Sequence, residues 1–263
     1  MQKYWYLFCS SWRDTIFYRS KIIAFALVWL VRVGLMYAVY AYAFQYRGGA
    51  VQGMNFQAAI WSIALYFVVF SLCIRRVYKD IADDIYTGTI ETKLNKPFHY
   101  ILYHVCMRLG KGVPHFLLFV FLAFPLLMLS VGFPLASFSL SWLLEVAFLL
   151  VLGIGITFLL YSIVGISAVW LTDAEPMYWI LDKAVMILGG SYVPVALFPM
   201  AMRTVAEFTP FGAATFITHA FNPDFQERWV LLAGVQMMWG IVLFLLLVAL
   251  HHYANKKLSI NGG

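Results

Sequence analysis

Residues 140–171 read LSWLLEVAFLLVLGIGITFLLYSIVGISAVWL, and Glu145 is the only charged residue among them. A helix of about 20 apolar residues crosses the hydrocarbon core of a bilayer. This stretch is longer than that and lacks the alternation of apolar and polar residues that membrane strands show. It therefore predicts a membrane-spanning helix.

Five similar stretches occur elsewhere, and the composition of the whole chain agrees with them. Of the 263 residues, 63% are hydrophobic and 11% are charged, and the mean hydropathy is +0.83, which is far outside the range of soluble proteins. Because backbone groups must be paired within lipid, we expect residues 1–263 to form a single all-α, polytopic transmembrane domain. The six expected transmembrane helices are 22–44, 56–74, 113–131, 140–171, 177–198 and 229–250.

The distribution of basic residues predicts the orientation. Lys and Arg collect on the cytoplasmic side of membrane proteins. If both ends of a six-span chain lie on one side, fourteen of the 18 Lys and Arg residues fall on that side, and the opposite side carries only Arg47, Arg203 and Arg228. We therefore expect both termini in the cytoplasm, and we attribute the net charge of +6 to this asymmetry, with no role in binding nucleic acid.

Residues 1–21 precede the first span and have an amphipathic pattern. Trp5, Phe8, Trp12 and Ile16 recur every three or four positions, and charged residues fall elsewhere around the helix. This pattern is typical of an interfacial helix lying along the cytoplasmic membrane surface. A plain extension of the first span is the alternative.

Residues 75–112 form the only substantial polar segment, and the charge distribution places it in the cytoplasm. Val77, Ile81 and Ile85 recur every four residues beside acidic ones, which predicts a short amphipathic helix. Gly88 is suited to end that helix.

A second short helix is expected over residues 89–95, before Pro97. An ordinary solvated loop is the alternative for both short helices. Asp182 is expected to lie in the solvated inner connection between the fourth and fifth spans.

The fifth span is interrupted by Gly189, Gly190, Pro194 and Pro199, and residues 189–228 form a broken helix and outer segment. Broken helices at membrane depth occur only where they are buried in protein or line a polar cavity. An ordinary kinked helix followed by a long outer loop is the alternative.

Arg32 lies about ten residues into the first span, near the middle of the membrane. A charge at that depth is costly, so the side chain should face a cavity, a subunit interface or a partner. Glu145 is the nearest candidate partner. An ion pair or carbonyl contact, binding of an anionic substrate headgroup, and a misplaced span boundary all remain open.

Residues 88–97, GTIETKLNKP, resemble the segment after the second helix of type II ATP-binding-cassette (ABC) exporter permeases. A second block is similar to the Gly, Pro, Phe-Pro and closing Pro pattern around the fifth helix of that family; it comprises Gly189-Gly190, Pro194, Phe198-Pro199 and Phe208-Thr209-Pro210. The resemblance covers essentially the whole chain in length, span number and block order. It is closest to permeases of this length that are often encoded beside a second, dissimilar permease.

The resemblance implies a subunit of the bacterial plasma (inner) membrane that moves an amphipathic or lipidic substrate outward. A cytosolic ABC ATPase dimer would bind ATP and Mg, a second copy or a homologous permease would complete the path, and membrane lipid would surround it. The broken segment would form re-entrant helices near the outer leaflet. The candidate translocation path comprises Arg32, Glu145, Gly189, Gly190, Pro194 and Pro199. Residues 77–97 would carry the coupling surface, formed by Ile81, Ile85, Gly88, Ile90, Glu91, Leu94 and Pro97.

The motifs of this chain are consistent with ATP binding by a separate subunit. Residues 109–112, LGKG, lack the first Gly and the hydroxyl residue of a phosphate-binding GxxxxGK[ST] loop. No HExxH or GxSxG occurs either, so we expect no cofactor and no enzymatic activity in this chain. An ion-coupled carrier, which would need intramembrane carboxylates or an inverted repeat, and an intramembrane enzyme are the alternatives.

Overall fold

The computed structural model describes residues 2–46, 50–132 and 139–261. Within these ranges the chain is predominantly helical, and a short hairpin is its only β structure. The elements are α1 (Gln2–Phe17), α2 (Arg19–Tyr46), β1 (Ala50–Val51), β2 (Met54–Asn55), α3 (Phe56–Ser71), η1 (Ile74–Arg76), α4 (Val77–Tyr86), α5 (Thr89–Leu94), α6 (Tyr100–Ser130), α7 (Leu140–Ser167), α8 (Glu175–Leu188), η3 (Val195–Leu197), α9 (Met200–Phe208), α10 (Pro210–Ala213), η4 (Phe216–Phe221) and α11 (Phe225–Asn261).

Five helical stretches among the described residues are long and apolar enough to cross a membrane. They are Ile22–Tyr46, Phe56–Tyr86, Tyr100–Ser130, Leu140–Ser167 and Phe225–Lys257. The chain is therefore an all-α, multi-pass membrane protein, as predicted.

The fifth expected span, 177–198, differs from the prediction. Helix α8 has 14 residues, which is about 21 Å and shorter than the roughly 30 Å hydrocarbon core. The chain then continues through η3, α9, α10 and η4, and every residue of η4 is buried. The irregular backbone of η4 is thus buried in protein, as such backbone at membrane depth must be, whereas Met200, Val205 and Phe208 of α9 are exposed.

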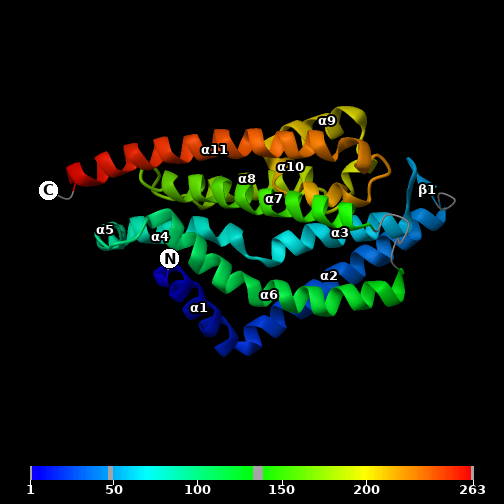
Figure 1. Cartoon of the computed structure of the whole chain (residues 1–263), viewed down its shortest axis with the longest axis horizontal. Helices are drawn as coiled ribbons and strands as arrows, with labels where there is room; N and C mark the ends of the chain where they lie inside the picture. Colours follow the sequence, from blue (N-terminus) through cyan, green and yellow to red (C-terminus); the bar gives the residue numbers. More distant parts are fainter. Residues whose placement is uncertain (1, 47–49, 133–138, 262–263) are drawn as a thin grey trace.

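The two ends of the molecule differ (Figure 1). Both termini lie at the end that holds α4 and α5, called here the α5 end. The hairpin and α9 lie at the opposite end, called here the α9 end, and α11 runs between the two. Helix α3 is central and is buried along nearly its whole length. Arg47 lies outside the described residues.

Helix α1 is separate from α2 and meets it at an angle (Figure 1), so the simple extension of the first span is wrong. It packs along the start of α6, where the backbone N–H of His99 donates to the Tyr4 hydroxyl at 3.0 Å and the Lys3 ammonium donates to the carbonyl of Pro97. Residues 100–112 are the first turns of α6, against which α1 packs, and are not part of a polar loop. The membrane-surface position of α1 stays a prediction.

Gly165 lets α4 lie directly on α7. A Cβ atom at this position would be 2.8 Å from Cβ of Ile81 and 2.9 Å from the carbonyl oxygen of Tyr78. Gly153 similarly approaches the carbonyl of Ala214. These small residues therefore bring helices of one chain together.

We expect Gly165→Ala to lower the free energy of unfolding by about 1–3 kcal/mol, because the new methyl group would force α4 away from α7. Gly155→Ala is the matched control on the same helix, since a Cβ there meets nothing within 4 Å, and it should be neutral or stabilising by about 0.5–1 kcal/mol. Unfolding of the purified protein in detergent measures both. Equal effects would contradict the packing described.

Candidate functional site

Both short helices predicted after the second span exist. Val77 and Ile81 are buried on the inner face of α4, Thr87 ends the helix, and Gly88 adopts a φ of 70° that favours glycine. Helix α5 follows at once. The chain thus forms a compact pair of helices and not a solvated loop.

The apolar side chains of this pair face inward, which corrects the expected coupling surface. Ile81 is 1% exposed and Ile90 is 5% exposed, so neither is free to contact another protein. Ile85 and Leu94 are half-buried against the core. The sequence pattern identified an apolar face, but that face is occupied by the chain's own core.

The exposed residues of α4 and α5 define what we call the α4–α5 surface. Among the expected coupling residues, Gly88, Glu91 and Pro97 are exposed. Together with the exposed residues that directly follow each helix, the surface comprises Lys79, Asp83, Tyr86, Thr87, Gly88, Thr89, Glu91, Thr92, Asn95, Lys96 and Pro97. It is polar, with one large aromatic ring.

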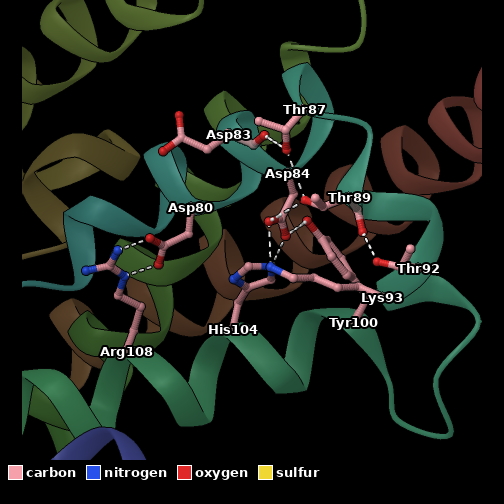
Figure 2. A network of polar contacts seen from close by, with 10 residues as sticks. All are labelled: Asp80, Asp83, Asp84, Thr87, Thr89, Thr92, Lys93, Tyr100, His104 and Arg108. Atoms are coloured by element: carbon pink, nitrogen blue, oxygen red, sulfur yellow. Dashed lines mark hydrogen bonds and ion pairs between the residues drawn. The ribbon is translucent and has the colours of Figure 1, made fainter. Parts of the chain in front are cut away.

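A buried carboxylate holds α4, α5 and α6 together (Figure 2). Asp84 accepts a hydrogen bond from the Lys93 ammonium at 2.5 Å and from the Tyr100 hydroxyl at 3.0 Å. Nε2 of His104 lies 3.2 Å from the carboxylate, and the Thr89 hydroxyl donates at 3.4 Å. One acidic side chain therefore joins three helices.

A second ion pair fixes α4 to α6. The Arg108 guanidinium donates from two nitrogens to both carboxylate oxygens of Asp80, a bidentate geometry that also restrains orientation. Asp83, on the opposite side of α4, points away from these contacts (Figure 2). The α4–α5 pair is thus attached to the membrane helices on its inner side and open on its outer side.

Another ion pair links the start of this region to α8. The chain breaks after α3, where Cys73 has a φ of 54°, and Arg75 turns inward to pair with Asp182. The Tyr161 hydroxyl donates to the same carboxylate at 2.9 Å, and the Phe70 ring lies 3.3 Å from the guanidinium carbon. Asp182 is 3% exposed, so its expected solvated position is wrong.

Arg32 is half-buried and lies among aromatic rings. The ring centroids of Trp29, Phe67 and Tyr192 are 5.3 to 5.5 Å from its guanidinium carbon, within the range of cation–π attraction. Tyr192 belongs to the irregular segment after α8. The structure therefore brings Arg32 together with that segment.

Glu145 is not the partner of Arg32. Its carboxylate accepts from Nε2 of Gln226 at 3.1 Å, and the described residues show no ion pair between Arg32 and a carboxylate. Of the residues expected to line a path, Arg32 and the broken segment meet, and Glu145 stands apart.

The break after α8 follows from its glycines. A Cβ atom on Gly189 would be 2.2 Å from Oγ1 of Thr215, so only glycine allows η4 to approach. The hydroxyls of Thr215 and Thr218 donate to the Gly189 carbonyl at 3.2 and 3.4 Å. Gly190 has a φ of 79° and turns the chain away.

The two prolines then direct the segment outward. Pro194 precedes η3 and Pro199 precedes α9, where a missing N–H costs no helical hydrogen bond. Between the glycines and Pro194, the Tyr40 hydroxyl donates to the carbonyl of Tyr192 at 2.7 Å. The segment is therefore held to α2 on one side and to η4 on the other.

The α9 end contains an ion cluster that the sequence reading missed. Glu207, 2% exposed, accepts from Arg203 at 2.8 Å and from Arg228 at 2.9 and 2.5 Å, and Asp224 pairs with both arginines. Burial raises the pKa of Asp224, but the hydrogen bonds and positive charge supplied mainly by Arg203 and Arg228 together outweigh burial and leave the pKa below its ordinary value. The four-residue spacings from 203 to 207 and from 224 to 228 were the available signal.

We expect Asp84→Asn to lower the free energy of unfolding by about 1.5–3 kcal/mol, because charge-assisted hydrogen bonds from two helices are lost. Asp83→Asn, one residue away and exposed, should change it by less than about 0.5 kcal/mol. Thermal unfolding in detergent compares the two. Similar effects would show that the Asp84 network does not hold the helices together.

Within the described ranges, no group of three or more His, Cys, Asp or Glu residues is placed to hold a metal ion. Comparisons of the chain with protein-family models, curated proteins and solved structures find no match.

Proposed function

We propose that this chain is the membrane-spanning permease subunit of an ABC exporter. The observation that carries the proposal is the α4–α5 surface: a short, polar helix pair that projects at one end of a membrane protein and is fixed internally by Asp84 and Asp80. Such a unit is suited to receive a force, because it cannot move without the helices to which it is bonded.

In this proposal a cytosolic ATPase dimer docks on the α4–α5 surface and supplies ATP and Mg, which this chain does not bind. Residues Tyr86, Thr87, Glu91 and Thr92 would form the contact, with Gly88 and Pro97 beside them. Ile81 and Ile90 would act from beneath by seating the helices on the core. The α5 end and both termini would then lie in the cytoplasm of a bacterial plasma membrane.

Movement of α4–α5 would reach the α9 end through contacts within the chain. Helix α4 lies on α7 at Gly165, and Arg75 joins the start of this region to Asp182 of α8. Helix α8 is capped by Gly189, whose carbonyl accepts a hydrogen bond from the Thr215 hydroxyl. The fifth crossing would be completed by the re-entrant segment from η3 to η4, which gives six crossings in all.

The substrate path would run beside Arg32, whose guanidinium is half-buried among rings and adjoins the break at residues 189–199. A second copy or a homologous permease would close the path, and the amphipathic or lipidic substrate would leave at the α9 end. A cation with aromatic walls suits an anionic, partly apolar substrate.

An ion-coupled carrier is the second candidate, and one observation favours it. Asp182 is a buried carboxylate with an Arg and a Tyr as partners, a set found in ion pathways of transporters. Because such a carrier needs no ATPase, recovery of the partner separates the two candidates.

The experiment is mild-detergent purification of the tagged chain, with mass spectrometry of accompanying proteins and an ATPase assay. We expect a nucleotide-binding subunit with the wild type, and at least about tenfold less of it with Thr87→Glu/Thr92→Glu, since two carboxylates would be placed in the contact. Recovery of the chain without such a subunit under several mild detergents would favour the carrier.

Thr204→Glu/Ser141→Glu is the matched control. Both residues are exposed and lie on helices of the α9 end, and the Thr204 hydroxyl bonds the carbonyl four residues earlier, as that of Thr87 does. This variant should retain the ATPase. Equal loss in both double variants would remove the α4–α5 surface from the proposal.

A further inference from the structure

A cavity of about 880 Å³ lies at the bend between α1 and α2. Four parts of the chain line it: the end of α1, the start of α2, the break after α3, and the third to fifth turns of α6. Such a volume is within the roughly 300–1,000 Å³ of small-molecule sites. The cavity lining includes Ile22, the residue at which the first membrane span begins.

One wall of this cavity is basic. Arg76, Arg108 and Lys111 line it together with His115. Arg108 is neutralised by Asp80, but the ion pairs of the described residues give neither Arg76 nor Lys111 a carboxylate partner.

The facing wall is apolar and continues along the membrane-facing side of α2. Ile22 and Phe25 line the cavity, and Phe25 packs edge-on against His115 at 4.8 Å. Immediately beyond it, Ile23 is 56% exposed and Leu27 is 57% exposed. The cavity thus combines two cations that have no carboxylate partner among the described residues with the start of a helix whose apolar side chains are exposed.

We infer that this cavity binds the headgroup of an anionic phospholipid of the surrounding membrane. The phosphate lies between Arg76 and Lys111, and the acyl chains extend along Ile23 and Leu27 of α2. Asp14, the one carboxylate of the cavity lining, is exposed on α1, where it accepts donor groups of the headgroup. The bound lipid fixes the bend between α1 and α2, and the site stands independently of the proposed transport function.

The test is native mass spectrometry of the purified full chain titrated with phosphatidylglycerol or with phosphatidylcholine of the same acyl chains. We expect phosphatidylglycerol to bind at least about tenfold more tightly, because only the anionic headgroup gains from two unpaired cations. Arg76→Gln/Lys111→Gln should weaken phosphatidylglycerol binding about 30-fold. Equal affinity of the wild type for the two lipids would overturn the inference.

Two further variants test whether lipid binding depends on the cations of this cavity. Lys79→Gln/Lys96→Gln removes the same charge from exposed positions of the α5 end outside the cavity and should leave binding unchanged, and Arg76→Lys/Lys111→Arg should retain it. An equal loss in the first variant would reduce the effect to general surface charge and overturn the site. Competition by soluble glycerol phosphate as strong as by the lipid would identify a free-anion site instead.

Discussion

The buried ion pair between Arg75 and Asp182 is the contact on which the arrangement of this chain depends. Removing an ion from water costs several kcal/mol, and removing one partner of a buried pair costs about 3–5 kcal/mol. Arg75 follows the break after α3, and Asp182 is in the middle of α8. The start of the α4–α5 region and the helix that leads to the broken segment are therefore joined by a bond that is costly to separate.

The other polar clusters are found near the two ends. Asp84 gathers α4, α5 and α6 at the α5 end, whereas Glu207 gathers α9 and the start of α11 at the α9 end. Between them the core is built mainly from apolar and aromatic side chains. This distribution gives two rigid ends and a middle where glycines such as Gly165 and Gly189 set the helix contacts.

Much of the fold could be predicted from the sequence, because span length and helical periodicity are local properties. Helices over residues 22–44 and over most of 140–171, the short helices within residues 77–95 and the break at Gly189 were all expected, and the structure contains them. Which neighbour a given side chain contacts could not be predicted in the same way. Ile81 has the spacing of an amphipathic helix whether its partner is an ATPase or α7, and only the fold shows that α7 occupies it.

The missed charges have a related cause. Asp182 was expected in a solvated connection and residue 75 at the start of a polar cytoplasmic segment, but the left-handed turn at Cys73 redirects the chain and Arg75 pairs with Asp182. Glu207 and Arg228 are distant in sequence, so their pairing depends on how α9 returns to α11. Counting Lys and Arg residues predicts on which side of the membrane a connection lies, but it does not reveal ion pairs of this kind.

In the proposed exporter the α4–α5 surface lies in the cytoplasm and α9 lies outside, and site-specific labelling tests this placement most directly. Cys9, Cys73 and Cys106 would be replaced by Ser, and Thr87→Cys or Thr204→Cys would be introduced singly. A membrane-impermeant maleimide applied to intact cells should label Thr204→Cys, and should label Thr87→Cys only after the membrane is opened. Labelling of both from the same side would contradict the account.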